Sequence, residues 1–264
     1  MKSSDQKNWI VIPSRLNSTR LSEKALQLIA GKPLIVHVLE GAMKSIIAEK
    51  IIVATDHDSI ASVIKQNIND QRVECVMTPS ELPSGTDRCL YAVLQFPPEA
   101  RPRRVFNIQG DEPLIQGSFI DELMMAWSPD SKIEMMTVAR PLADLDDLNN
   151  LNVVKVLLNA KSEAIYFSRF PIPFSKASPK TIQEISNPFH HIGIYGFEIE
   201  FLKKFCSAGV SSIEQGESLE QLRALQLGAL IYVHLTHQKL MGVDTAEDVK
   251  KVEDEMIRRR KDVG

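Results

Sequence analysis

The chain has 264 residues, of which 44% are hydrophobic, and its 31 basic and 34 acidic side chains leave a formal net charge of −3. This length fits one large α/β domain or one domain with a subsidiary lobe. The charge excludes a general electrostatic match to nucleic acid. No apolar run is long enough to span a bilayer, and three widely spaced cysteines exclude a disulfide framework. We therefore expect a cytoplasmic protein that binds neither membrane nor nucleic acid.

Strand-like and helix-like segments alternate through the first half of the chain. Short apolar runs predict strands, and apolar residues at helical spacing predict helices. The predicted strands cover 10–13, 50–56, 73–77 and 104–109, and the predicted helices cover 34–47, 58–68 and 87–96. Strands separated by helices form βαβ units in a parallel sheet covered on both faces. We therefore predict an α/β fold with a mostly parallel central sheet, in which residues 9–140 form a nucleotide-binding half.

The second half has strands with fewer helices between them. Predicted strands cover 135–139, 153–158, 164–167, 191–197 and 230–235, and predicted helices cover 217–227 and 245–257. The stretch 175–188 is polar and contains prolines, which predicts a loop. We expect this half to form a smaller mixed α+β lobe, with 141–264 completing a single domain.

The first predicted strand ends in a loop that is rich in positive charge. Arg15, Arg20 and Lys24 follow in quick succession among hydroxyl and amide side chains. Ligands of open α/β sheets bind beyond the carboxyl ends of the strands, and cationic side chains bind phosphate oxygens. The glycine spacings of a P-loop and of a dinucleotide fingerprint are absent. The loop is therefore either a phosphate-binding loop that uses side chains or a solvated surface loop.

Two carboxylates follow the strand predicted at 104–109. Gly110 precedes Asp111 and Glu112, and its missing side chain lets a ligand approach closely. Carboxylates beside a phosphate site need a cation between them, and Mg²⁺ is commonly held by one or two carboxylates together with phosphate oxygens. We favour metal binding over helix capping for Asp111, whereas Glu112 fits either role.

Two helix starts carry polar residues with competing explanations. Ser84 and Gly85 precede a predicted helix, where they suit either a polar ligand or an N-cap formed by Ser84 or Thr86. Asp244 precedes the last predicted helix, where a capping box accounts for it without any ligand.

The second half offers one polar strand face and one polar helix face. His191 and Tyr195 share a strand face by their period of two. Glu220 and Gln221 lie on the polar side of the helix predicted at 217–227. All four side chains suit the recognition of a polar substrate. Half-buried strand residues and a solvated helix face are the simpler explanations from the residues alone.

Taken together, motifs from both halves resemble the 3-deoxy-manno-octulosonate (Kdo) cytidylyltransferase family. The match runs from about residue 10 to residue 252, in order and with plausible spacing. Any single motif is weak, but many in register are specific. The motifs are Pro13-Ser14-Arg15, Ser18-Thr19-Arg20-Leu21, Lys24, Gly31-Lys32-Pro33, Val53-Ala54-Thr55-Asp56, Ser84-Gly85-Thr86-Asp87-Arg88, Asn107-Ile108-Gln109-Gly110-Asp111-Glu112-Pro113, Tyr166-Phe167-Ser168-Arg169, His191-Ile192-Gly193-Ile194-Tyr195, Leu219-Glu220-Gln221-Leu222-Arg223 and Gly242-Val243-Asp244-Thr245.

The resemblance implies a Rossmann-like nucleotidyltransferase fold and one reaction, in which CTP and Kdo give CMP-Kdo and diphosphate for lipopolysaccharide biosynthesis. It also implies Mg²⁺ as cofactor and a homodimer built from the second half, which would bind the sugar. The implied residues are Arg15 and Lys24 for the triphosphate, Ser84, Gly85 and Arg88 for the cytidine, Asp111 and Asp244 for Mg²⁺, and Arg20, Gln109, His191, Tyr195, Glu220 and Gln221 for Kdo.

The chain departs from the family pattern at one place. The family usually has Leu-Pro-Gly-Lys where this chain has Leu21-Ser22-Glu23-Lys24, so that Glu23 adds negative charge beside the predicted phosphate site. Two alternatives to a Kdo enzyme are a nucleotidyltransferase for another sugar acid, such as sialic acid or amino-Kdo, and a non-catalytic nucleotide-binding regulator. The residues implied for the sugar favour Kdo, and the retained Asp111, Asp244 and Lys24 favour an enzyme.

Overall fold

A computed structural model describes residues 7–17, 21–128, 131–176, 180–185 and 188–262 of the chain. The chain divides into two compact units. The first unit combines the chain up to Met125 with the segment from Lys239 onward, and the second unit runs from Ala126 to Gln238.

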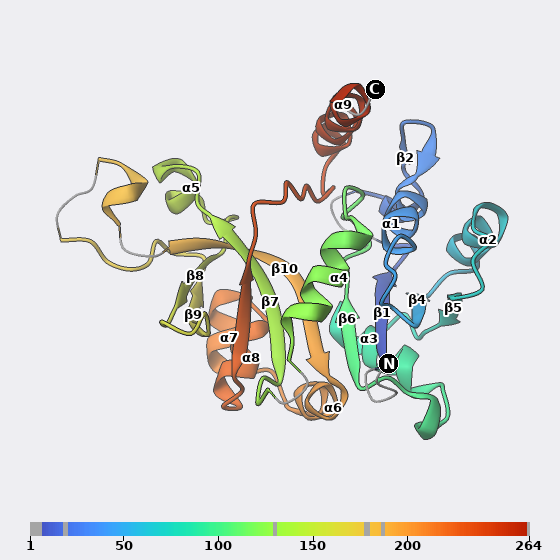
Figure 1. The fold of residues 1–264 in the computed structure, drawn as a ribbon, viewed down its shortest axis with the longest axis horizontal. Coiled ribbons are helices and arrows are strands. Elements are labelled where there is room, and N and C mark those ends of the chain that lie inside the picture. The colour runs from blue at the N-terminus through green and yellow to red at the C-terminus, as the bar shows by residue number, and fades with distance from the viewer. Residues whose placement is uncertain (1–6, 18–20, 129–130, 177–179, 186–187, 263–264) are drawn as a thin grey trace. The chain divides into compact units, whose positions relative to one another are not determined.

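The first unit contains a parallel sheet in which β6, β1, β4 and β5 follow one another (Figure 1). These strands are β1 Asn8–Ser14, β4 Lys50–Thr55, β5 Val73–Met77 and β6 Arg104–Asn107. The register aligns Ser14 with Thr55 and Thr55 with Met77. The polar loops that follow β1, β4 and β5 therefore leave the same edge of the sheet, which places the candidate ligand residues of this unit together.

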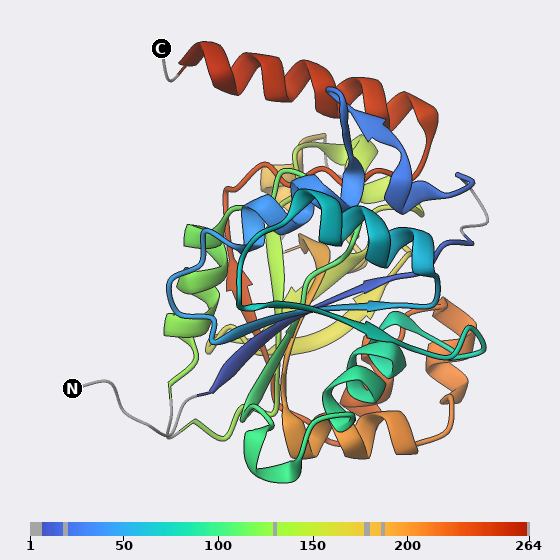
Figure 2. The ribbon, with the colours of Figure 1, turned by 90° about the vertical axis from the view of Figure 1, so that its right-hand side faces the viewer.

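Helices cover both faces of this sheet. They are α1 Leu34–Ala42, α2 Asp58–Asn67, α3 Gly85–Leu94 and α4 Gly117–Ala126. A further helix, α9 Ala246–Asp262, packs on the segment 28–33, and η1 Lys24–Leu26 and η2 Pro98–Ala100 are short turns. Figure 2 shows α1 and α2 on one side of the strands and α3 on the other. A small hairpin of β2 Leu28–Ile29 and β3 Lys32–Pro33 precedes α1. The predicted α/β class with a parallel sheet is confirmed.

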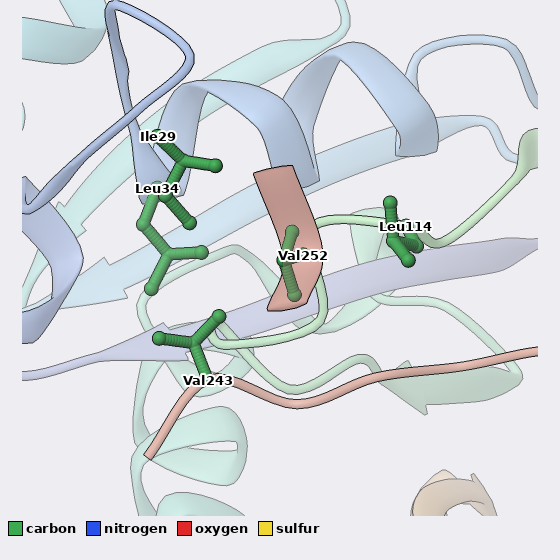
Figure 3. Close-up of a cluster of buried hydrophobic side chains, with 5 residues drawn as sticks. All are labelled: Ile29, Leu34, Leu114, Val243 and Val252. Atoms are coloured by element: carbon green, nitrogen blue, oxygen red, sulfur yellow. The ribbon is translucent and has the colours of Figure 1, made fainter. Parts of the chain in front are cut away.

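A hydrophobic cluster joins the last helix to the first half of the chain (Figure 3). Its members come from the hairpin, the start of α1, the loop after β6, the segment before α9, and α9 itself, and none exposes more than 5% of its surface. They are Ile29, Leu34, Leu114, Val243 and Val252. Burial of such side chains contributes roughly 1.5–3 kcal/mol each. The cluster fixes the segments next to Asp111 and Asp244, which are two of the predicted site residues.

The second unit is a mixed α+β structure. Its strands are β7 Met135–Pro141, β8 Lys155–Leu158, β9 Ala164–Ser168, β10 Pro188–Glu198 and β11 Ile231–Leu235. β7 pairs in parallel with β11 and antiparallel with β10, and the pairs β10–β8 and β8–β9 are antiparallel. The helical segments are α5 Leu145–Asn149, η3 Ile182–Glu184, α6 Ile199–Ser207, α7 Ser212–Glu217 and α8 Gln221–Gln226.

The boundaries of the two units differ from those of the predicted halves 9–140 and 141–264. β7 belongs to the second unit because it pairs with β10 and β11, and α9 belongs to the first because it packs on the hairpin. Periodicity marks the elements of a chain but not their partners. Sequence analysis missed the hairpin and the helices α4, α5, α6 and α7. Part of the predicted loop 175–188 (177–179 and 186–187) lies outside the described residues.

Two predicted helices begin or end at different residues in the structure. The helix predicted at 34–47 ends at Ala42, and the turn after it is held by Asp121, which accepts hydrogen bonds from the Ser45 side chain and from the Ile46 and Ile47 amides. The helix predicted at 217–227 corresponds to α8 alone, which begins at Gln221, because Ser218 has a left-handed backbone (φ 52°) that ends α7 at Glu217. In the described part of the chain, no helix is both long and apolar enough to cross a membrane.

Candidate active site

The loop after β1 presents a cationic side chain and is held by a neighbouring loop. Arg15 directly follows β1, and its side chain is exposed. The next residue, Leu16, donates its backbone N–H to Asp56 Oδ1 at 2.9 Å, from the loop after β4. Parallel strands bring these two loops to one edge of the sheet, as the sequence predicted. Arg20 lies outside the described residues, so its predicted place is not described.

Lys24 lies between two carboxylates. Its Nζ is 2.5 Å from Asp111 Oδ2 and 3.1 Å from Asp244 Oδ1, and the lysine side chain is 18% exposed. Burial by itself lowers the pKa of Lys24, but the charges and hydrogen bonds of Asp111 and Asp244 outweigh it, and the pKa lies above its usual value. Three residues that the sequence predicted from separate motifs therefore meet in one ion-pair network, with the lysine firmly charged.

The backbone explains why the two carboxylates meet. Val243 donates its N–H to the Asp111 carbonyl at 2.9 Å, which sets the segment before α9 against the segment after β6. Gly110 is needed next to Asp111, because a Cβ there would lie 2.9 Å from the Pro13 carbonyl oxygen. Neither carboxylate has to cap a helix. Asp111 precedes α4 by several residues, and the capping pair at the start of α9 is formed by Thr245 and Asp248.

The donor set of this network suits a hard divalent cation. Asp111 and Asp244 supply two carboxylates, the number that Mg²⁺ typically takes from protein when phosphate oxygens complete its shell. With Lys24 they carry two negative charges and one positive charge, which would repel a triphosphate without a further cation. Within the described residues, no group of three or more His, Cys, Asp and Glu side chains is arranged to hold a metal by itself. The residues therefore fit a Mg²⁺ ion that binds together with a nucleotide.

The start of α3 lies at the same edge of the sheet. Ser84 is its N-cap, with the side chain accepting the Asp87 N–H at 3.1 Å and donating to Asp87 Oδ2 at 2.7 Å. The capping explanation of Ser84 is thus confirmed, and its role toward a nucleotide stays a prediction. A Cβ on Gly85 would lie 3.3 Å from the Pro13 side chain. α3 therefore begins in close contact with the end of β1.

Arg88 on α3 is buried, although the resemblance implies that it lines the cytidine. Only 3% of its side chain is exposed. Its guanidinium donates from Nη2 to Asp56 Oδ2 at 3.3 Å and from Nη1 to Thr78 Oγ1. Sequence analysis did not give Asp56 a role, although Asp56 closes one of the family motifs. The position at the end of β4 was the available signal.

In the second unit, a chain of hydrogen bonds joins three of the residues predicted to bind the sugar. The Tyr195 hydroxyl donates to Gln221 Oε1 at 3.3 Å, and Gln221 Nε2 lies 3.4 Å from His191 Nδ1. His191 Nε2 lies 2.8 Å from Thr137 Oγ1, which itself donates to the Ile194 carbonyl at 2.9 Å. Thr137 carries no sequence signal of this role.

This order of donors fits a neutral imidazole with its proton on Nε2. Gln221 then donates to Nδ1, and Nε2–H donates to Thr137. Burial, with His190 as a smaller cause, lowers the pKa of His191 from 6.5 to about 3. Burial, followed by the Glu220 charge, raises the pKa of Tyr195 well above its usual value. His191, Tyr195 and Gln221 are at least 94% buried rather than half-buried.

The remaining predicted residues are placed less specifically. Glu220 is the partly buried N-cap of α8, close enough to act on Tyr195 electrostatically. Gln109 follows β6 in the first unit and is partly buried. Glu217, on the same predicted helix face as Glu220, is not simply solvated, since its carboxylate accepts from Ser168 Oγ at 2.6 Å and from the Arg169 N–H at 2.9 Å.

Comparisons with known proteins agree on one family. A sequence model of the family described as cytidylyltransferase matches residues 9–232. The 3-deoxy-manno-octulosonate cytidylyltransferase of Bdellovibrio bacteriovorus is 43% identical over 243 residues, covering 92% of this chain and 95% of that protein. The enzyme of the same name from Polynucleobacter necessarius is 41% identical over 246 residues, covering 92% of this chain and 93% of that protein.

A solved structure is similar over almost the whole chain. It is a CMP:2-keto-3-deoxy-manno-octonic acid synthetase in complex with CTP, with a TM-score of 0.86 and 30% sequence identity, covering 96% of this chain and 100% of that chain. The family resemblance drawn from the motifs is confirmed by these matches.

The depressed pKa of His191 predicts how stability depends on pH. In the unfolded chain this histidine gains a proton as the pH falls through about 6.5, whereas in the folded protein it stays neutral to about pH 3. Its contribution is therefore present above pH 6.5 and lost as the pH falls. Between pH 7 and pH 5, the wild type should lose about 2 kcal/mol more unfolding free energy than His191→Gln. Urea unfolding at both pH values measures this, and equal losses would contradict it.

Proposed function

The chain belongs to the cytidylyltransferase family, and we propose that it transfers CMP from CTP to Kdo, giving CMP-Kdo and diphosphate. The observation that carries this proposal is the ion-pair network of Lys24, Asp111 and Asp244, together with the exposed Arg15. These residues supply the cations and carboxylates that a nucleoside triphosphate and its metal need, at the carboxyl ends of the strands.

The chemistry consists mainly of positioning and charge neutralisation. The anomeric hydroxyl of the sugar attacks the α-phosphorus, and diphosphate leaves. Arg15 and Lys24 bind the triphosphate and offset the negative charge that grows on the leaving group. The N-terminal turn of α3, from Ser84 and Gly85 onward, lines the cytidine, with Arg88 packed behind it.

Asp111 and Asp244 would hold Mg²⁺, and the ion would polarise the α-phosphate when bound. The two carboxylates already share one cation, since both lie within 3.1 Å of the Lys24 ammonium group.

The buried polar chain of the second unit gives it fixed donors and acceptors for a sugar acid. His191, Tyr195 and Gln221 orient one another through their hydrogen bonds, and Glu220 adds an acceptor for sugar hydroxyls. Arg20 and Gln109 complete the predicted set, with the Arg20 guanidinium suited to the sugar carboxylate.

The protein works in the cytoplasm, in the synthesis of lipopolysaccharide precursors. Cys75, Cys89 and Cys206 are not joined in disulfides, and a reducing compartment keeps such thiols reduced.

We also propose that the protein is a homodimer built on the second unit. Phe170 and Phe174 expose 70% and 89% of their surface. They border a hollow of about 580 Å³ that Leu145, Leu148 and Ile185 also line. Large exposed apolar groups next to an apolar hollow are typical of an interface, and a two-fold axis lets one such surface supply both the protruding ring and the hollow.

The proposed reaction is tested by diphosphate release from CTP and Kdo in the presence of Mg²⁺. We expect release that requires both substrates, with UTP, ATP and sialic acid as controls. Release with another sugar acid but not with Kdo would keep the mechanism and change the substrate. CTP binding without release from any sugar acid would favour the non-catalytic alternative.

Asp111→Asn should lower kcat by at least about 100-fold, because the variant loses one of the two carboxylates that hold the cation. Steady-state kinetics at saturating CTP and Mg²⁺ measures this effect. Glu247→Gln is the matched control, since its carboxylate lies three residues after Asp244 but is 78% exposed. Near-normal turnover in Asp111→Asn would refute the metal role.

Phe174→Asp should convert the dimer to a monomer, because a charge would be buried in the apolar interface. Size-exclusion chromatography with light scattering reads the mass directly. Ile46→Asp is the control, as it places the same charge on a residue that is 87% exposed in the first unit. A Phe174→Asp dimer as stable as that of the control would place the interface elsewhere.

A further inference from the structure

One buried guanidinium ties together the loops that follow β4 and β5. Arg88 on α3 donates to Asp56, which follows β4, and to Thr78, which follows β5. Thr78 is itself fixed, since both its N–H and its hydroxyl donate to the Thr55 carbonyl, at 2.8 and 3.0 Å. Arg88 is thus held at one end by a rigid part of the sheet edge and reaches Asp56 at the other.

Asp56 passes this constraint to the loop after β1. Its two carboxylate oxygens have different partners. Oδ2 accepts from Arg88 Nη2 at 3.3 Å, and Oδ1 accepts from the Leu16 N–H at 2.9 Å. Leu16 is the residue next to Arg15, so fixing its amide fixes the direction in which the Arg15 side chain leaves the backbone. Asp56 is 10% exposed and Arg88 is 3% exposed, so the link is shielded from water.

The negative charge of Asp56 is unexpected beside the loop that carries Arg15. A carboxylate next to a loop that binds a triphosphate lowers its affinity by simple Coulomb repulsion. Arg88 offsets this charge, and a charged acceptor makes a stronger hydrogen bond to a backbone N–H than a neutral one does. The carboxylate at this place is therefore explained by the Leu16 amide that it holds, because its charge acting directly on a triphosphate would only weaken binding.

We propose that Asp56 is a positioning residue for the loop that carries Arg15, and that Arg88 acts on the nucleotide through Asp56 instead of touching it. The proposal rests on the proposed function in taking CTP as the ligand of this loop. The two residues form a clamp, defined here as the Arg88–Asp56–Leu16 link.

A double-mutant cycle tests the clamp. The variants are Asp56→Ala, Arg88→Met and the double variant, and the measurements are the Kd for CTP by calorimetry and the KM values for CTP and Kdo. Each single variant should weaken CTP binding by about tenfold, which corresponds to about 1.4 kcal/mol. The double variant should be no weaker than the weaker single variant, because both changes break one link. The KM for Kdo should stay within about twofold.

Two results of this cycle would overturn the proposal. If Arg88 touches the nucleotide, Arg88→Met weakens CTP binding again in the Asp56→Ala background. If Asp56 is merely structural, Asp56→Ala lowers the melting temperature and kcat but leaves the KM for CTP unchanged. Where Arg88→Met fails to fold, Arg88→Lys replaces it in the cycle.

Asp56→Asn separates the hydrogen bond from the charge. Asparagine removes the negative charge, as alanine does, but keeps one oxygen that can accept the Leu16 N–H. We expect it to lose less CTP affinity than Asp56→Ala. CTP binding by Asp56→Ala that equals or exceeds that of Asp56→Asn would overturn the clamp, since charge alone would then explain the residue.

Hydrogen exchange at the Leu16 amide tests the clamp independently of the proposed function. It is measured by NMR on the protein without nucleotide. Exchange should be faster in Asp56→Ala and in Arg88→Met than in the wild type. If the wild type does not bind CTP, the proposed function fails and the clamp is judged by this exchange alone. Unchanged exchange in Asp56→Ala would overturn it.

Discussion

The ammonium group of Lys24 is the contact on which the arrangement of the first unit's site depends. It joins two carboxylates whose residues lie 87 and 220 positions further along the chain. Without the Lys24 ammonium group, the carboxylates of Asp111 and Asp244 would repel each other, since both lie within 3.1 Å of its position. The hydrophobic cluster around Val243 and Val252 and the Val243–Asp111 backbone bond supply the binding energy that brings these segments together. Apolar burial positions the segments, and Lys24 neutralises half of the negative charge that results.

The departure from the family pattern at Glu23 leaves Lys24 in place. Glu23 has a left-handed backbone (φ 49°), the conformation that glycine adopts at little cost and that costs another residue about 1 kcal/mol. The turn is still closed by backbone bonds, from Leu26 N–H to the Glu23 carbonyl at 2.8 Å and from Gln27 N–H to the Lys24 carbonyl at 3.2 Å. The Glu23 side chain is exposed. The substitution therefore changes the charge of the turn much more than its shape.

Sequence reasoning located the strand ends and most candidate residues but not the internal partners of these residues. Alternation of strands and helices predicts a parallel sheet, and so it predicts that the loop carrying Arg15 leaves the sheet at the carboxyl ends of the strands. It says nothing about whether Arg88 points to solvent or into the protein, because a helix N-terminus offers both. His191 and Tyr195 were predicted on one face correctly, yet their burial depends on Gln221 and Thr137, which lie on other elements. Long-range pairing of this kind leaves no trace in local periodicity.

The discontinuous first unit has a consequence for how the protein is made. Asp244 and α9 leave the ribosome only after the whole segment from Ala126 to Gln238 has been synthesised. At roughly 5–20 residues per second this takes on the order of ten seconds. Throughout that interval the nascent first unit lacks Val243 and Val252, so the apolar surfaces of Ile29, Leu34 and Leu114 stay uncovered. That surface is one on which chaperones have time to act, and Lys24 acquires its second carboxylate partner, Asp244, only at the end of translation.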